Sequence, residues 1–188
     1  MKKQKGFTVL ELLIVVAIIG ILSAIVLGQI KTARERAKDK AIFENLQSAR
    51  NEISIYYSNN GTYGTYGITG TAISTGNNSK CVSSLLATGT SVFTKSGDAQ
   101  AEKTKEAIAA SNSASNGTLV GTGTQRFSNT RCATNGASAA IAATLATDNT
   151  KSWCVDSTGF AGEVTGNAAT STAVLLYDLT NSTVRCNS

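Results

Sequence analysis

The feature that most constrains the fold of this chain is an apolar run near its N-terminus. From Phe7 to Gly28 the sequence is almost wholly apolar, and only Thr8, Glu11 and Ser23 interrupt it. At about 1.5 Å per residue, these 22 positions form a helix of roughly 33 Å, enough to cross a hydrocarbon core of about 30 Å. A buried core helix is the alternative, but no second apolar layer follows that could cover it. We therefore expect one membrane-spanning helix.

The apolar run is expected to stay attached to the rest of the chain. A removable secretory signal would have an apolar stretch of roughly 7–15 residues, followed by a small-residue cleavage site. This run is longer and ends in Gly28-Gln29-Ile30-Lys31. Three lysines precede it and five Lys or Arg residues follow it within positions 31–40, so positive charges alone do not set its orientation. Four cysteines in a small polar domain favour disulfides, and hence a non-cytoplasmic location for that domain.

Composition excludes most familiar hydrolase designs. The 188 residues include no His, which removes the commonest general base and every Ser-His or Cys-His nucleophile. The net charge of +5 is mostly an N-terminal effect, because Lys2, Lys3 and Lys5 supply three of the charges. Without residues 1–6 the chain has 14 Lys and Arg against 12 Asp and Glu. This small excess of positive charge does not by itself indicate a nucleic-acid partner. Because His is absent, we expect neither an enzyme nor a cofactor.

From Lys31 to Asn60 the pattern is that of an amphipathic helix. Apolar residues recur mainly at steps of three or four, and Asn59-Asn60-Gly61 closes the run. Because Pro is absent, only Gly20 and Gly28 weaken the helix, each by about 1 kcal/mol relative to Ala. We therefore predict one continuous helix of about 50 residues, whose apolar face needs a partner surface. The recurring apolar residues are Ala33, Ala37, Ile42, Leu46, Ala49, Ile53, Tyr56 and Tyr57.

Two pairs of opposite charges lie on the polar side of this helix. Lys31 and Glu35 are four residues apart, as are Lys40 and Glu44, and this spacing places each pair on one face. We expect both to be ion pairs that support the helix rather than parts of a binding site.

Beyond Gly61 the sequence becomes rich in Thr, Ser, Asn and Gly, and the expected elements are short. They are a loop over 61–80, a short element over 81–87, a helix over 98–110 capped by Ser96 or Asp98, strands over 139–146 and 152–156 joined at Asp148-Asn149, and strands over 173–177 and 183–186. The strands are expected to form one antiparallel sheet that packs on the amphipathic helix in a single core. Trp153, Val155, Val174, Leu176 and residues 53–57 would fill that core. The predicted fold class is α+β, with a long N-terminal helix on a small sheet.

Glu11 is the residue in the apolar run that most demands an explanation. A carboxyl group within a membrane helix is costly, and such groups are more often functional than structural. Nothing else between Phe7 and Gly28 can neutralise it, so its counter-charge must come from outside the segment. Snorkelling to the membrane surface is one solution and a positive group on another chain is the other. We favour the intermolecular partner.

The first residues also resemble a known signal. The segment KKQKGFTVLELLIVV, residues 2–16, closely resembles the type III signal of type IV pilins and related pseudopilins. It has a basic leader that ends in Gly6, then Phe7, then Glu11 four residues later, and then an unbroken apolar run. The resemblance is closest over residues 1–30 and extends to the amphipathic helix. Further on it rests on the general layout and on the segment WCVDSTG, residues 153–159.

The resemblance implies a processing and assembly route. A prepilin peptidase would cleave between Gly6 and Phe7 on the cytoplasmic side, and the new Phe7 amine would be methylated. Glu11 would pair with the N-terminal amine of a neighbouring subunit while an inner-membrane platform and motor build a helical filament. The chain would then consist of a leader (1–6), a transmembrane and filament-core helix (7–30), an amphipathic stalk (31–60) and a pilin head (61–188), with the head outside the cytoplasm.

The function implied by the resemblance is that of a structural subunit of a type IV pilus-like filament. Such a subunit would wait in the cytoplasmic (inner) membrane as a single-pass protein and later stand in an extracellular pilus. A pseudopilin of a type II secretion system, a minor competence pilin and a membrane-anchored exported binding domain are the alternatives. Many pilins have Pro at the position of Gly28, so unwinding between Gly20 and Gly28 on assembly stays open.

The four cysteines allow three pairings, which spacing alone does not separate. Zinc is the rival use of these residues, but the chain has no CxxC spacing and no His, so we expect no metal site. The resemblance favours one disulfide that closes a C-terminal loop and a second between the two remaining cysteines. These pairs would be Cys154 with Cys186 and Cys81 with Cys132.

One cluster in the head would suit a nucleic acid. Arg126, Phe127 and Arg131 would place two cations beside a ring on which a base could stack. A solvated loop is the interpretation we favour for this stretch, so nucleic-acid binding is possible but not supported.

Overall fold

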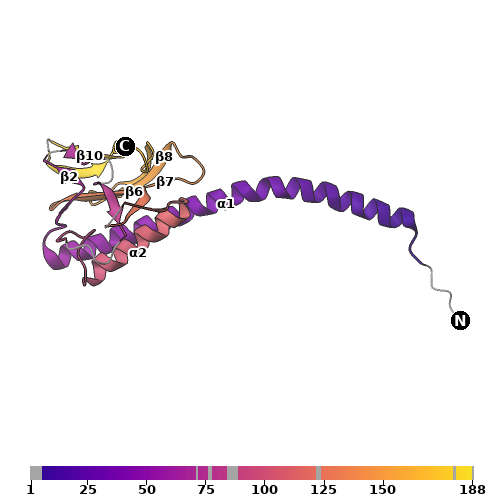
Figure 1. The fold of residues 1–188 in the computed structure, drawn as a ribbon, viewed down its shortest axis with the longest axis horizontal. Helices are drawn as coiled ribbons and strands as arrows, with labels where there is room; N and C mark the ends of the chain where they lie inside the picture. The colour runs from indigo at the N-terminus through magenta and orange to yellow at the C-terminus, as the bar shows by residue number, and fades with distance from the viewer. Residues whose placement is uncertain are drawn as a thin grey trace.

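The computed structural model describes residues 6–70, 72–75, 78–83, 89–121, 124–179 and 181–187. It consists of a long helix α1 (Val9–Asn60), a second helix α2 (Ala99–Ala114) and eleven short or medium strands gathered at one end of α1 (Figure 1). Leader residues 1–5 and residues 84–87 of the expected short element lie outside the described ranges. The strands are β1 Thr65–Tyr66, β2 Ile68–Thr69, β3 Ala72–Ile73, β4 Lys80–Val82, β5 Leu119–Val120, β6 Arg126–Asn135, β7 Ala139–Thr144, β8 Lys151–Asp156, β9 Ala161–Thr165, β10 Leu175–Asp178 and β11 Thr183–Cys186.

Helix α1 is continuous over 52 residues, as predicted. At its start, Thr8 is the N-cap and forms a capping box with Glu11, which satisfies backbone donors that have no intrahelical partner. At its end, Gly61 adopts φ 69° and its N–H donates to the carbonyl of Tyr57 at 2.7 Å. This left-handed conformation suits glycine because it has no Cβ. The helix contains no Pro and is gently curved (Figure 1).

The two halves of α1 have different surroundings. Up to Val26 every described side chain is exposed, whereas the C-terminal half packs on the head through one stripe. The stripe follows steps of three and four, as expected for one face of a helix, and its members are Ile42, Leu46, Ala49, Ile53 and Tyr56. The predicted amphipathic face therefore finds its partner surface within the same chain.

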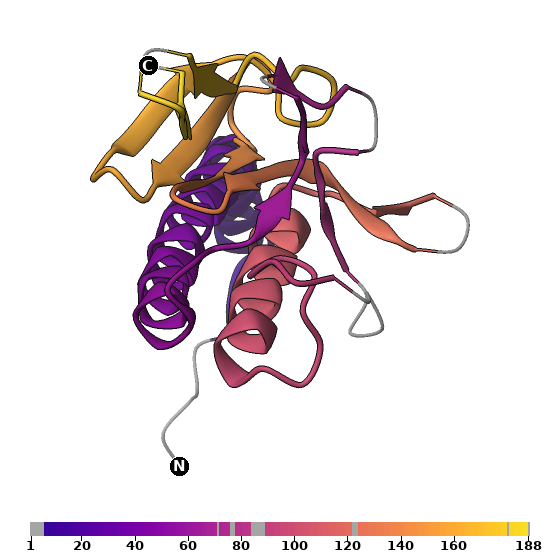
Figure 2. The same cartoon turned by 90° about the vertical axis from the view of Figure 1, so that its left-hand side faces the viewer.

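Helix α2 lies beside α1 on the same side of the large sheet (Figure 2). Asp98 caps it, because its Oδ1 atom accepts hydrogen bonds from Gln100 N and Ala101 N at 3.1 Å each. The helix was expected to end at residue 110, but it continues to Ala114. The last turn is rich in Ser and Asn, which have low helix propensity; burial of Ser111 and Asn112 keeps this turn helical.

The large antiparallel sheet has the order β1-β6-β7-β8-β9, and β4 and β5 also pair with β6. Strands β7 and β8 and the turn between them were predicted. The ten-residue β6 was not, and neither was β9; Arg126, Phe127 and Arg131 lie in β6 rather than in a loop. The expected loop over 61–80 also contains β1 to β3. Strands that are very short or rich in polar residues have no clear hydrophobic period, so sequence periodicity does not reveal them.

Strands β10 and β11 do not complete this sheet, contrary to the prediction. They pair only with one another and lie over the face of the large sheet opposite the helices (Figure 2). The core is consequently double. In β7, Ile141 and Ala143 face the helices, whereas Ala140 and Ala142 face the layer that contains Val184. Because successive residues of a strand point to opposite faces, burial on both sides makes the whole of β7 apolar.

The predicted core residues divide between these two faces. Val155 and the partly buried Trp153 belong to the helix side, with Ile53 and Tyr56 of α1. Val174 belongs to the opposite side, and Leu176 is 37% exposed. The Trp153 ring meets the Phe43 ring edge-on, with centroids 4.9 Å apart, which joins the sheet to α1.

Candidate functional site

The N-terminal end of α1 presents one carboxylate to a network of local donors. Thr8 donates from its backbone N and its Oγ1 atom to Glu11 Oε2, at 2.8 and 2.9 Å. In return, Glu11 N donates to Thr8 Oγ1 at 3.3 Å. Thr8 was not a predicted site residue, although the Thr-x-x-Glu spacing of a capping box was a signal for it. Within the described residues Glu11 has hydrogen-bond donors but no ion-pair partner, and Phe7 beside it is 92% exposed.

The apolar residues that follow Glu11 are exposed on all sides of the helix. Up to Val26 the exposed fraction of these large side chains runs from 65% at Leu12 to 49% at Val15, without a buried face. By length and composition the helix is able to cross a membrane, with a mean hydropathy of 3.0 over its most apolar 18-residue window. Because this surface surrounds the helix, a single contact with the head could not cover it.

The head is fixed to α1 near the middle of the helix by two polar contacts. Asp39 Oδ1 accepts from Ala146 N at 2.6 Å and from Thr147 N at 3.4 Å, and its Oδ2 atom accepts from the Thr147 hydroxyl. These groups belong to the turn between β7 and β8. Lys38 Nζ donates to Asn116 Oδ1 at 2.6 Å, just after the end of α2. Asp39 was not a predicted site residue, because its partners are more than 100 residues away in sequence.

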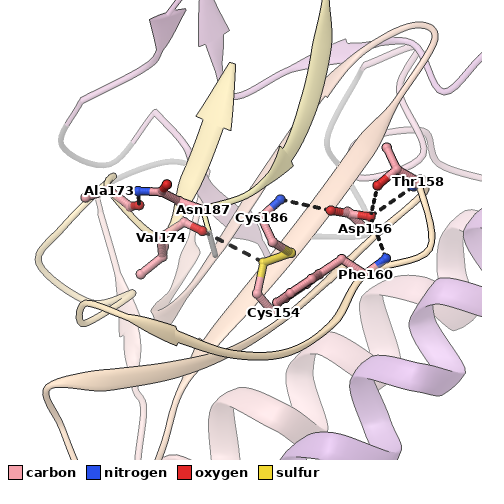
Figure 3. The surroundings of a disulfide bond; sticks show 8 residues. All are labelled: Cys154, Asp156, Thr158, Phe160, Ala173, Val174, Cys186 and Asn187. Carbon is pink, nitrogen blue, oxygen red and sulfur yellow. Dashed lines mark hydrogen bonds between the residues drawn. A yellow bond between two sulfur atoms is a disulfide. The ribbon is translucent and has the colours of Figure 1, made fainter. Parts of the chain in front are cut away.

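The cysteines form two disulfides, Cys81–Cys132 and Cys154–Cys186, the pairs that the resemblance favours. Figure 3 shows the second bond, which ties β11 to β8. All four thiols are therefore engaged, and zinc cannot use them. Among the described residues, no three His, Cys, Asp or Glu side chains gather into a possible metal site.

Asp156 organises the surroundings of the C-terminal disulfide. Its Oδ1 atom accepts from Thr158 N at 2.9 Å, from Thr158 Oγ1 at 2.7 Å and from Phe160 N at 3.1 Å (Figure 3). Its Oδ2 atom accepts from Cys186 N at 3.0 Å. A buried carboxylate is tolerated when donors surround it. Asp156 thus holds the β8–β9 turn and the last strand together, which explains the WCVDSTG segment structurally.

The cluster proposed for nucleic acid does not form a binding surface. Phe127 is 6% exposed and Arg131 is 2% exposed, so neither a stacking ring nor that cation is accessible. Arg131 Nε donates to the carbonyl of Ala168 at 2.9 Å, and its Nη1 atom donates to Ser79 Oγ at 2.7 Å. Arg131 therefore has a structural role inside the head.

Lys80 is a second buried cation beside Arg131, its register partner in the β4–β6 pair. Its Nζ atom donates to the carbonyls of Ser128 and Ala169, the latter at 2.9 Å. Burial, and then the charge of Arg131, lower the pKa of Lys80 to about 8. The sequence contained no signal for this pair, because both residues lie in polar stretches.

The chain is similar to one known family at its N-terminus and to several known proteins. Residues 1–27 match the family described as the prokaryotic N-terminal methylation motif. The chain is 41% identical over 63 residues to the type IV wide pilus major component PilA4 of Thermus thermophilus, covering 34% of this chain and 48% of that protein. It is 42% identical over 60 residues to the fimbrial protein EcpC of Eikenella corrodens, covering 32% of this chain and 39% of that protein.

A similar likeness links the chain to a secretion protein. It is 34% identical over 65 residues to the type II secretion system core protein G of Vibrio cholerae, covering 35% of this chain and 44% of that protein. The chain thus spans less than half the length of each of these three relatives. No solved structure matches. The methylation motif and these likenesses, together with the apolar helix with Glu11 and the α+β head, support a type IV pilin or pseudopilin.

Proposed function

We propose that this chain is a non-enzymatic structural subunit of a type IV pilus-like filament. In this proposal it is cleaved between Gly6 and Phe7, methylated at the Phe7 amine and assembled through its apolar N-terminal helix. The observation that carries the proposal is the apolar surface of residues 9–26, which is exposed all around α1 and begins beside a single carboxylate. Such a surface requires either lipid or the helices of other subunits as its surroundings.

The two environments correspond to two stages. In the cytoplasmic membrane the helix crosses the bilayer once, with the head outside the cytoplasm. In the filament the same surface packs against neighbouring helices, which replace lipid without exposing apolar area to water. An inner-membrane platform and motor would extract the subunit, after processing by the prepilin peptidase and methyltransferase.

Glu11 sets the register between subunits in this proposal. In the separate chain its carboxylate binds Thr8, one residue from the amine that cleavage would create at Phe7. In the filament the carboxylate would accept the amine of an adjacent copy as its counter-charge. A carboxylate buried without such a partner costs several kcal/mol, so any other register is strongly disfavoured.

The test compares two variants in a cell that has the assembly machinery. Glu11→Ala should insert into the membrane but yield no filaments, whereas Glu163→Ala, which removes an exposed carboxylate of the head, should assemble normally. Mass spectrometry of the mature wild-type chain should find an N-methylated Phe7 at its start. The proposal is wrong if the Glu11 variant assembles as well as the wild type, or if residues 1–6 remain attached.

A second candidate is a pseudopilin of a type II secretion system, favoured by the likeness to core protein G. Deletion of the gene separates the two functions. A pilus subunit should be required for surface filaments visible by electron microscopy, with the subunit identified in them. A pseudopilin should be required for protein export, and its native host should have no surface filaments that contain it.

A further inference from the structure

The positive charge of the mature chain is concentrated in one short segment of α1. Residues 29–40, here called the collar, contain five Lys or Arg and two Asp or Glu. The 148 residues that follow contain nine of each, so they carry no net charge. Between Phe7 and Gly28 the only charged side chain is that of Glu11. The collar therefore supplies the whole positive excess, at the point where the apolar segment of the helix ends.

Most of the collar cations are exposed and unpaired. Lys31, Arg34, Arg36 and Lys40 are exposed, and in the described part of the chain none of them forms an ion pair. The expected pairs Lys31–Glu35 and Lys40–Glu44 are thus not closed in the structure. The remaining charges of the collar are partly buried, and Lys38 and Asp39 bind the head. The exposed charge of the collar is therefore almost entirely positive.

The four free cations surround the helix. At 3.6 residues per turn, Lys31 and Arg34 lie on one side of α1, and Arg36 and Lys40 lie on the opposite side. A helix lying flat on a charged surface would gather its cations on one face. A ring of cations instead fits a helix that passes through a layer of negative charge.

Distances along the helix place the collar at the membrane surface. At about 1.5 Å per residue, Lys31 lies roughly 8 Å beyond Val26 and Lys40 roughly 21 Å beyond it. The polar layer on each side of a bilayer is about 5–8 Å thick, and screening at physiological salt extends over about 8 Å. Lys31 and Arg34 are therefore within reach of lipid phosphates, and Lys40 contributes a weaker, longer-range share.

We propose that the collar binds the phosphate groups of anionic phospholipids on the membrane face where residues 29–40 emerge. The inference rests on the proposed function, because it concerns the stage before assembly in which the helix spans the membrane. Arg34 and Arg36 can each present two parallel N–H donors to a phosphate, and the lysines act as point charges. Extraction into a filament then requires the collar to exchange these phosphates for other surroundings.

The test measures retention of lipid in detergent micelles by the chain that begins at Phe7, because Lys2, Lys3 and Lys5 of the leader would themselves attract anionic lipid. The chain is titrated with phosphatidylglycerol or phosphatidylcholine, and native mass spectrometry records the lipid that remains bound. The collar variant is Lys31→Gln, Arg34→Gln and Lys40→Gln. Its matched control removes the same charges from exposed residues of the head and is Lys103→Gln, Lys151→Gln and Arg185→Gln.

The wild-type chain should prefer phosphatidylglycerol, and high salt should weaken that preference. One Lys or Arg near an anionic surface changes affinity about 5-fold, so the collar variant should bind phosphatidylglycerol roughly 10- to 100-fold more weakly. The control should bind like the wild type. Fluorescence of Trp153 verifies that both variants are folded.

Three results would overturn the proposal: equal retention of the two lipids by the wild type, an unchanged collar variant, or an equal loss in the control. Association between copies in phosphatidylcholine that the collar variant abolishes would assign the collar to an acidic protein surface and would also overturn it. The assay needs no assembly machinery, so its outcome is independent of the filament test on Glu11.

Discussion

Removal of the Asp39 carboxylate should loosen the head from the helix. Asp39 lies near the apolar half of α1 and binds the turn between β7 and β8 of the large sheet. Hydrogen bonds to a charged group contribute about 1.5–3 kcal/mol each when water does not compete. Here Thr147 is exposed and its backbone bond is long at 3.4 Å, so we count about 1 kcal/mol for each of the two shorter bonds. Asp39→Ala should therefore lower the free energy of unfolding by about 2 kcal/mol, and the melting temperature by about 4–8 °C.

The single tryptophan makes this change measurable. Trp153 contacts Phe43 of α1 through ring edges, so its fluorescence should change when the helix leaves the sheet. Guanidinium titration of the full chain in detergent would compare Asp39→Ala with Glu35→Ala, which removes the same charge one turn earlier. Glu35 forms no bond to the described residues of the head. The control should change stability by less than about 0.5 kcal/mol. Equal effects of the two variants would show that charge, and not the contact with the β7–β8 turn, stabilises this region.

Two further predictions use the same unfolding measurement. The pKa of Lys80 is about 8 in the folded chain and 10.5 ordinarily. Between these pH values the unfolded chain holds more protons than the folded chain. The free energy of unfolding should therefore rise with pH in this range, by at most about 1.4 kcal/mol per pH unit. Lys80→Met should flatten most of that rise, leaving the part due to Lys105, whose pKa burial also lowers; an unchanged slope would contradict the assignment. Gly67→Ala should cost more than about 2 kcal/mol, because its φ is +71° and a Cβ would lie 2.2 Å from the carbonyl oxygen of Cys132. Gly70→Ala, with φ +60° and open space around the Cβ, should cost only about 1 kcal/mol, and equal losses would refute the role of the close approach.

The long helix could be predicted from sequence because its signals are local. The absence of Pro, the regular apolar stripe and the Gly61 C-cap all lie within α1 or next to it. Strands β7 and β8 were visible for a similar reason, since an apolar run and a short strand flank a turn of Asp and Asn. Local propensity and tertiary structure agree in these elements, so they can be predicted from the sequence.

Strand β6 was not predictable, because its polar residues are satisfied by distant partners. Thr134 Oγ1 donates to the carbonyl of Gly64, 70 residues away, and Asn129 N donates to Asn112 Oδ1. Arg131 is buried because carbonyl and hydroxyl oxygens from other segments receive its donors. No local pattern reports such contacts, so this stretch was interpreted as a loop.

The candidate site divides in the same way. Glu11 stands out in sequence because a carboxyl group contrasts with the apolar residues around it, whereas the role of Asp39 depends on a turn more than 100 residues away. The role of Thr8 was not predicted, although its signal, the Thr-x-x-Glu spacing of a capping box, is local.

The course of α1 along the head also determines how the subunit would bear tension. The helix meets the head near Asp39 and ends at the far side, at Gly61, so its buried stripe from Ile42 to Tyr56 lies parallel to any pull on its apolar half. Such a force loads the stripe in shear, and all of its side chains resist together instead of separating one after another. In the proposed filament, this arrangement would make the contact between α1 and the head strong along the direction of stretching.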